Sequence, residues 1–167
     1  FIVHPDYNRR SDVHDIALIR LEASSTKPVL PMEESGEDFA EGALGIVLGW
    51  GALSAGWSSE YSTILQQAEL PLLTNADCES KGSDILSDSM ICAGYEEGGV
   101  DSCVGDSGGP LLRRNGTETH LIGITSFGTG DCAEPGEVGV YTRVTAYREW
   151  IEVALQQEPS TESEATE

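Results

Sequence analysis

The chain has 167 residues, 39% of them hydrophobic, which is enough for one domain with a buried core. Its 9 basic and 29 acidic residues give a formal charge of −20, which disfavours binding to nucleic acid or to anionic lipid surfaces. No apolar run approaches the about 20 residues of a membrane-spanning helix, so we expect neither nucleic acid nor a membrane among its partners.

The chain opens at Phe1 without a methionine, a charged segment or an apolar segment. Neither a signal peptide nor a natural start is therefore visible, and Phe1 looks like an internal residue. We expect a longer protein of which this chain is a part.

Five apolar or alternating runs, separated by glycine and polar clusters, predict short β-strands. The runs cover residues 43–50, 65–72, 110–112, 121–126 and 138–144. Short strands at this density are typical of an antiparallel barrel.

Two sequence signals begin at Asn115. Asn115-Gly116 separates two apolar runs and predicts a β-hairpin. Asn115 also begins the triplet Asn-Gly-Thr, which makes it a glycosylation candidate on an exposed turn.

Three further segments differ from the strands. Residues 33–41 are acidic and contain glycine, which predicts an exposed segment. Apolar residues recur at helical spacing near the C-terminus and predict a helix packed on the barrel, with core residues Tyr147, Trp150, Ile151, Ala154 and Leu155. Residues 159–167 repeat Ser, Thr and Glu, which predicts a disordered tail.

Four cysteines allow three pairings, and the spacing alone does not choose among them. No Cys-x-x-Cys or Cys/His zinc pattern is present. Disulfides would indicate an oxidising compartment and a secreted protein. The alternative is four reduced thiols in a cytosolic protein.

The segment from Asp101 to Pro110 is the most informative part of the sequence. It places Ser107 in a turn rich in glycine, where missing side chains let a substrate carbonyl approach the backbone. The N–H groups of Gly105 and Ser107 can then point at a developing oxyanion. The alternative is a plain turn of small residues.

This segment resembles the active-site segment of trypsin-like (chymotrypsin-family) serine endopeptidases. Other stretches match the same family in the family's own order, so that the resemblance runs from Phe1 to about Leu155. They are His4–Tyr7, Asp15–Leu21, Gly49–Gly51, Leu65–Cys78, Met90–Tyr95, Ser126–Gly128, Gly139–Val144 and Tyr147–Ile151.

The resemblance implies an all-β fold, the chymotrypsin-like antiparallel double β-barrel with a C-terminal helix. Residues 1–27 would be the end of the first barrel with the catalytic aspartate, and residues 28–42 the linker between the barrels. Residues 43–157 would form the whole second barrel and the helix, followed by a disordered acidic tail at 158–167.

The resemblance also implies catalytic roles. Ser107 matches the nucleophile and Asp15 the acid that orients a histidine. The family's order is His, Asp, Ser, and none of the three histidines of this chain, His4, His14 and His120, stands in the family's histidine context. We expect the catalytic histidine outside this chain and these three on the surface.

Substrate binding follows from the same matches. Asp101 matches the acid at the floor of the primary specificity pocket, which selects Arg or Lys before the scissile bond. Small residues at the pocket wall leave room for a long side chain, and one strand segment pairs with the substrate backbone. The matched positions are Asp101, Ser102, Ser126, Phe127, Gly128 and Gly139.

Two further features are implied by the family. Asp106 matches the acid that pairs with the α-ammonium group freed when a zymogen is activated. The implied disulfides join Cys78 to Cys92 and Cys103 to Cys132. A third bridge common in the family would join the positions of Gly45 and Arg113, and both of its cysteines are absent here.

We therefore predict a secreted serine endopeptidase that cleaves after Arg or Lys through an acyl-enzyme at Ser107. We expect it to need no cofactor and no metal and to be a monomer, with peptide substrates and protein inhibitors as partners. This truncated chain alone would be inactive and zymogen-like at Gly105. The alternative is a non-catalytic protease homologue that acts as a binding or regulatory module.

Overall fold

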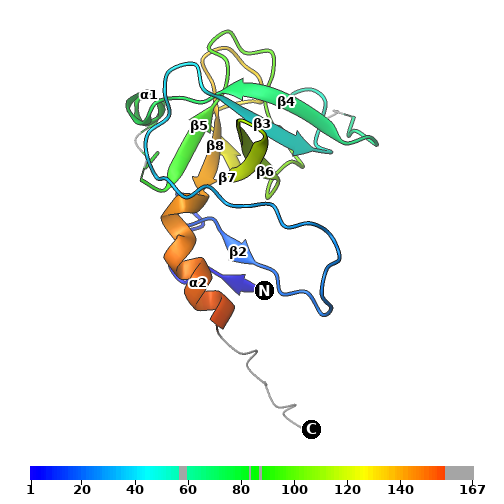
Figure 1. The fold of residues 1–167 in the computed structure, drawn as a ribbon. Coiled ribbons are helices and arrows are strands. Elements are labelled where there is room, and N and C mark those ends of the chain that lie inside the picture. Colours follow the sequence, from blue (N-terminus) through cyan, green and yellow to red (C-terminus); the bar gives the residue numbers. More distant parts are fainter. Residues whose placement is uncertain (57–59, 83, 87, 157–167) are drawn as a thin grey trace, which may run out of the picture.

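One six-stranded antiparallel sheet dominates the computed structural model, which describes residues 1–56, 60–82, 84–86 and 88–156 (Figure 1). The sheet curls into a half-barrel, and its strand order is β4-β3-β6-β7-β8-β5. The strands are β3 (Leu44–Gly49), β4 (Gln66–Pro71), β5 (Met90–Ala93), β6 (Pro110–Asn115), β7 (Glu118–Gly128) and β8 (Gly139–Arg143). The predicted all-β fold class is confirmed, and the tail expected at 158–167 lies outside the described residues.

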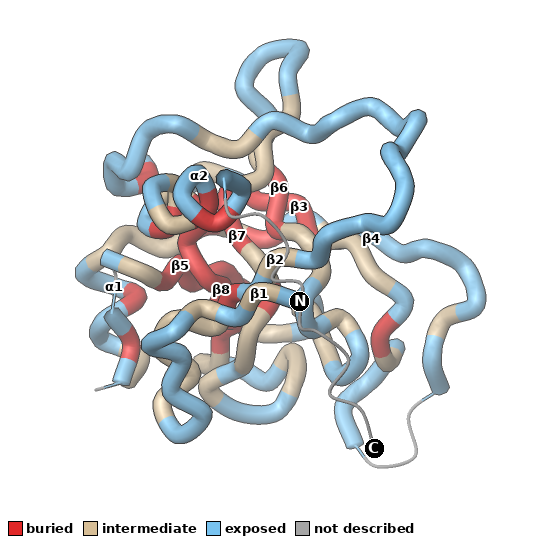
Figure 2. The backbone as a smooth tube through the Cα atoms, turned by 90° about the horizontal axis from the view of Figure 1, so that it is seen from below, coloured by how far each residue is buried: buried red, intermediate tan, exposed pale blue. Residues whose placement is uncertain are grey.

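The largest core cluster lies within this sheet, and Figure 2 shows the buried backbone concentrated in its strands. All four residues of β5 are buried, so β5 has no apolar and polar alternation to detect. The alternation analysis missed this strand for that reason.

Among the described residues, no helix is long and apolar enough to cross a membrane.

Strand β7 contains an irregularity that matters for the site. Thr125 pairs with Tyr141 and Phe127 pairs with Val140, so that Ser126 has no partner on β8. An extra residue of this kind is a β-bulge, which re-aims the side chain that it carries. The bulge leaves Ser126 free to turn its hydroxyl away from the ladder.

The predicted hairpin joins β6 to β7. Asn115 pairs with Glu118, so Gly116 and Thr117 form the two-residue turn. Gly116 has φ +64°, in the left-handed region that glycine adopts without a steric penalty. The hairpin is confirmed, but Asn115 is the last strand residue and does not belong to the turn.

A 3₁₀ turn, η1 (Val144–Tyr147), leads into the C-terminal helix α2 (Arg148–Gln156). Tyr147 and Ile151 pack with Ile16 in a separate core cluster, which Trp150 partly covers. The predicted helix is confirmed. Leu155 was expected in its buried stripe, but it lies 67% exposed because it falls off the face that packs on the barrel.

The acidic segment 33–41 is exposed except at Phe39, which is only 6% exposed and belongs to the main core. The guanidinium groups of Arg113 and Arg143 lie over its ring, 5.7 and 5.4 Å from the centroid. A carboxylate oxygen of Asp38 accepts a bond of 2.9 Å from the N–H of Asn75, at the start of α1 (Asn75–Ser80). The expected linker is therefore anchored at its centre.

Gly45 lies where β3 pairs with β6. Ile46 is opposite Leu112, so the same register continued by one residue brings Gly45 opposite Arg113. A side chain at Gly45 has no room, because a Cβ atom there would lie 2.8 Å from Leu111 Cδ1 and from Leu72 Cδ2. Leu111 and Leu72 thus fill the space next to Gly45.

The N-terminal segment forms a separate two-stranded sheet, in which β1 (Ile2–Val3) pairs with β2 (Ala17–Leu18). Its contact with α2 is aromatic. The rings of His4 and His14 stack at 4.7 Å, and His4 also meets Trp150 at 5.0 Å. The Tyr147 hydroxyl lies 3.1 Å from His14 Nδ1. These four rings join the segment that carries Asp15 to the C-terminal helix.

This ring cluster predicts acid sensitivity. Burial and the neighbouring His14 lower the pKa of His4 below its usual 6.5, although Asp6 opposes the shift. Below pH 6.5, His4 therefore binds a proton more readily in the unfolded chain than in the folded chain. This difference lowers the stability of the folded chain on acidification. We expect the melting temperature to fall below about pH 6.5, and to fall less in His4→Asn.

Asn retains an acceptor for the bond that the Asp6 N–H donates to His4 Nδ1. The matched control is His120→Asn, outside the cluster, which should retain the acid sensitivity of the parent. Identical pH profiles for His4→Asn and the parent would contradict the prediction.

Candidate active site

Ser107, the expected nucleophile, lies in the loop between β5 and β6 and lines a cavity of about 180 Å³. This loop, residues 94–109, is called the nucleophile loop below. Short backbone bonds fold this loop: the Asp106 N–H donates to Cys103 O at 2.9 Å and the Gly109 N–H to Asp106 O at 2.8 Å. The Gly108 N–H donates to Thr125 O at 2.8 Å, which fixes the loop to β7. The Ser107 side chain is thereby exposed on a loop with a defined shape.

The two expected oxyanion donors lie in this loop. Gly105 has φ +97°, and a Cβ atom there would lie 2.8 Å from the Tyr61 ring, so only glycine fits. Within the described part of the chain, no acceptor receives the N–H of Gly105 or of Ser107. Both donors are available to a ligand.

Asp15 is held from two strands of the sheet. The Ser126 hydroxyl, at the bulge of β7, donates to Asp15 Oδ2 at 2.6 Å. The Thr142 hydroxyl of β8 donates to the Asp15 backbone carbonyl at 2.7 Å. Since Ser126 also lines the cavity of Ser107, the structure brings Asp15 and the nucleophile loop to the same region of β7.

The role of Thr142 was missed in the sequence analysis. Its hydroxyl bonds to a backbone atom that is 127 residues away in the chain, and no local pattern encodes such a contact. The only available signal was its place in the matched stretch Gly139–Val144.

None of the three histidines contacts Asp15 or Ser107 in the described structure. His4 and His14 lie in the ring cluster on α2. His120, on β7, has Nε2 3.7 Å from Glu118, and its buried Nδ1 has no hydrogen-bond partner among the described residues. We expected all three histidines on the surface, but each of them is partly buried.

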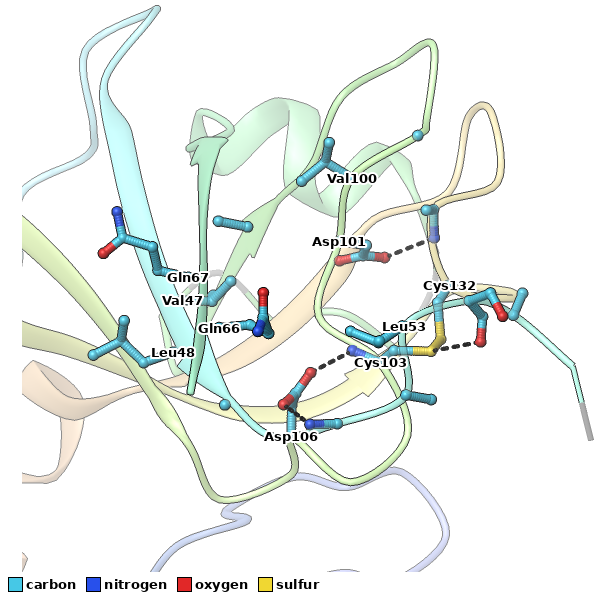
Figure 3. A pocket seen from close by; sticks show the side chains of 18 residues that line it. Val47, Leu48, Leu53, Gln66, Gln67, Val100, Asp101, Cys103, Asp106 and Cys132 are labelled. Carbon is cyan, nitrogen blue, oxygen red and sulfur yellow. Dashed lines mark hydrogen bonds between the residues drawn. A yellow bond between two sulfur atoms is a disulfide. The ribbon is translucent and has the colours of Figure 1, made fainter. Parts of the chain in front are cut away.

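Asp106 precedes Ser107 in the same loop, and Figure 3 shows its carboxylate close to Cys103. Its carboxylate accepts the N–H of Gly51 at 2.8 Å and that of Cys103 at 2.9 Å. A Cβ atom at Gly51 would lie 2.5 Å from the Asp106 carboxyl carbon, and one at Gly49 would overlap the same carboxylate. The Gly49-Trp50-Gly51 motif thus makes room for this acid.

Asp101 lies in the wall between the Ser107 cavity and a second cavity of about 230 Å³, which Asp106 also lines. Its carboxylate accepts the N–H of Ser102 at 2.8 Å and, as Figure 3 shows, a bond from the backbone of Ala133 at 3.3 Å. Burial raises the pKa of Asp101, and the charge of Asp106 raises it further. A cation beside Asp101 would favour the charged carboxylate again.

Small residues at the expected pocket wall give Asp101 its space. Gly128 and Gly139 both line the Ser107 cavity, and a Cβ atom at Gly139 would lie 3.1 Å from Asp101 Oδ1. The Ser102 hydroxyl contacts the Tyr141 hydroxyl at 2.9 Å, and burial raises the pKa of Tyr141. The expected pocket residues Ser126 and Phe127 line the same cavity.

Two disulfides are present, Cys78–Cys92 and Cys103–Cys132, the pairing that the family resemblance implies. The second bridge ties the nucleophile loop to the opposite wall of the Ser107 cavity.

Among the described residues, no group of three or more His, Cys, Asp or Glu could hold a metal ion.

Comparison with known proteins agrees with this geometry. The Trypsin family model matches residues 1–151. Over 153 residues the chain is 41% identical to Trypsin-1 from Astacus astacus, an overlap that covers 90% of this chain and 63% of that protein. The chain therefore spans less than two thirds of the length of this curated relative.

The glycine requirement around Asp106 predicts that Gly51→Ala destabilises the fold. The added methyl group would lie 2.5 Å from a carboxyl carbon that two backbone bonds hold in place, so the carboxylate or the backbone at Gly51 must shift. We expect a loss of about 2 kcal/mol or more in the free energy of unfolding, measured by urea denaturation.

Gly36→Ala is the matched control, because its Cβ atom would only reach Thr145 Oγ1 at 3.9 Å. Equal stability of the two variants would show that the Asp106 site tolerates a side chain at Gly51.

Proposed function

Because this chain belongs to the trypsin family of serine proteases, we propose that it provides the nucleophile, the orienting acid and the specificity pocket of an endopeptidase that cleaves after Arg or Lys. One observation carries the proposal. Asp101 and Ser107 line the same cavity of about 180 Å³, one with a partly buried carboxylate and the other with an exposed hydroxyl.

In the proposed reaction, the Ser107 hydroxyl attacks the scissile carbonyl carbon and loses its proton to a base. The N–H groups of Gly105 and Ser107 stabilise the negative oxygen of the tetrahedral intermediate. The amine leaves with that proton, and water then hydrolyses the acyl-enzyme. Backbone pairing of the substrate with Ser126–Gly128 would hold the scissile bond in place.

The base is the part of the reaction that this chain does not supply. Asp15 is positioned by Ser126 and Thr142, yet no imidazole of the described residues reaches it. We propose that Asp15 orients a histidine that is not one of the three in this sequence. The chain by itself would then be inactive.

Asp106 has a proposed role in activation. Its carboxylate borders the cavity of about 230 Å³, and its two described partners are neutral N–H groups. A partly buried carboxylate next to open space suits an incoming α-ammonium group. We propose that this ion pair forms when a zymogen is cleaved, and that this chain alone is zymogen-like at Gly105.

Secretion, glycosylation and partners complete the proposal. Two disulfides are typical of an oxidising compartment. Asn115, Gly116 and Thr117 are all exposed at the tip of the β6–β7 hairpin, where a glycan could be attached. The proposed partners are peptides with Arg or Lys at the cleavage position and protein inhibitors, and the proposed state is a monomer.

A second function is favoured by one observation. Without an imidazole at Asp15 and Ser107, the same pocket could bind a basic side chain and not cleave. The protein would then be a non-catalytic homologue that recognises basic segments.

Asp101→Ser tests the specificity. In the complete protein, we expect the substitution to lower kcat/KM for an Arg peptide by about 100-fold or more, because the buried pocket loses the partner of the substrate cation. The measurement compares paired peptides that differ only by Arg or Leu at the cleavage position. Equal hydrolysis of the two peptides by the parent, or an unchanged preference in the variant, would refute the pocket assignment.

Covalent labelling separates the enzyme from the binding homologue. The complete, activated protein should react at Ser107 with a serine-directed phosphonate, and Asp15→Asn should slow the labelling by about 1,000-fold or more. Ser107→Ala should abolish it. If the activated parent remains unlabelled while it binds an Arg peptide, the non-catalytic reading holds.

A further inference from the structure

We propose that Lys81 is a positioning residue for the specificity pocket, because its ammonium group fastens the nucleophile loop to the loop between β7 and β8 (residues 129–138). In the described structure Lys81 lines neither the Ser107 cavity nor the cavity beside Asp106, so it acts through other residues. The inference rests on the proposed specificity for Arg or Lys.

The Lys81 ammonium group contacts both loops. It donates to Glu96 Oε2 at 2.8 Å, in the nucleophile loop, and to the carbonyl oxygen of Gly136 at 3.1 Å, in the β7–β8 loop. The Lys81 side chain is only 18% exposed, which is unusual for a lysine. Its backbone is fixed as well, because its N–H caps α1 and the Cys78–Cys92 disulfide ties that helix to β5.

This contact differs from an ordinary surface ion pair. Glu96 is 79% exposed, and water and salt screen exposed charges, so the pair alone would matter little. The same ammonium group also satisfies the part-buried carbonyl of Gly136. It further supplies a positive charge to two stretches whose charged residues are all acidic. These stretches are residues 94–100 and 129–138, with Glu96, Glu97, Asp131, Glu134 and Glu137.

Backbone bonds continue from Lys81 to the pocket acid. The Gly136 N–H donates to Glu96 O at 2.9 Å, which joins the two loops directly beside the ammonium group. The Gly99 N–H donates to Ala133 O at 2.8 Å and joins them a second time. The Ala133 N–H in turn donates to Asp101 Oδ2 at 3.3 Å. A shift between the loops therefore reaches Asp101.

Ala133 holds a backbone conformation that needs support. Its φ is +60°, in the left-handed region that residues with a side chain rarely adopt. Such a residue keeps this conformation only where the surrounding contacts enforce it. Gly98 packs against Ala133 from the nucleophile loop, and Lys81 holds Gly136 a few residues further on. Without the ammonium group the β7–β8 loop can relax, and the Ala133 N–H then turns away from Asp101.

The charge of Asp101 depends on this N–H. Burial raises the pKa of Asp101, the N–H groups of Ala133 and Ser102 lower it again, and the charge of Asp106 raises it. The Tyr141 hydroxyl is the further titratable group near Asp101. Loss of the Ala133 bond would raise the pKa of Asp101 and weaken its hold on a cation.

The first experiment separates recognition from turnover in the complete, activated protein. Lys81→Met removes the ammonium group and keeps an apolar stem. We expect KM for an Arg peptide and the inhibition constant of benzamidine, a small cation, to rise at least about tenfold, while kcat stays within about threefold of the parent. Hydrolysis of a neutral activated ester should be unchanged, since it needs Ser107 but no side chain in the pocket.

Three variants serve as controls. Lys81→Arg keeps a cation that can reach both acceptors and should restore the parent KM to within about threefold. Glu96→Gln should raise KM less than Lys81→Met, because the Gly136 carbonyl still accepts from Lys81. Lys27→Met removes the charge of the other lysine, which is exposed, and should change nothing. An equal effect of Lys27→Met would assign the loss to net charge and overturn the proposal.

The pH dependence of benzamidine inhibition adds a readout that a general loss of stability would not move. Binding needs the charged carboxylate of Asp101, so affinity is lost as the pH falls through the pKa of that group. The midpoint of this loss should lie at a higher pH in Lys81→Met than in the parent and in Lys81→Arg. Equal midpoints in the parent and Lys81→Met would overturn the proposal.

The parent protein distinguishes this inference from the proposed function. If the parent hydrolyses an Arg peptide and binds benzamidine, and Lys81→Met does both equally well, only the role of Lys81 is refuted. If the activated parent neither hydrolyses an Arg or Lys peptide nor binds benzamidine, the proposed function fails and the role of Lys81 fails with it.

Discussion

The bond from the Ser126 hydroxyl to the Asp15 carboxylate, 2.6 Å long, joins two parts of the site that are 111 residues apart in the sequence. Its donor is available because a β-bulge takes Ser126 out of the ladder between β7 and β8. The preceding residue, Thr125, exchanges backbone bonds with Gly108 and Gly109 of the nucleophile loop. A single irregular point in one strand thus sets the position of Asp15 relative to Ser107.

Three aspartates surround this point, and their environments differ. Asp15 receives a hydroxyl, and Asp106 receives two backbone N–H groups. Asp101 also receives two backbone N–H groups, yet burial raises its pKa and it borders open space on two sides. The protein thus solvates three identical side chains in three different ways, as the different roles proposed for them require.

Much of this arrangement could be predicted from the sequence. The all-β fold, the β6–β7 hairpin and the C-terminal helix follow from periodicity and turn chemistry, which are local signals. The features that were missed are long-range. The buried strand β5 shows no alternation, and the bond from Thr142 to Asp15 depends on register across the sheet. The anchoring of Phe39 under two arginines likewise depends on residues from distant strands.

The Cys103–Cys132 disulfide has a consequence for engineering. The same bridge lines the Ser107 cavity, the cavity beside Asp106 and a third hollow of about 430 Å³ next to Tyr61. Volume gained in one of these spaces by moving the bridge is lost from another. A substitution that moves the bridge would therefore reshape all three spaces at once, whereas Gly128 and Gly139 line only the Ser107 cavity among the three. Redesign of that cavity can begin at those two positions and leave the bridge in place.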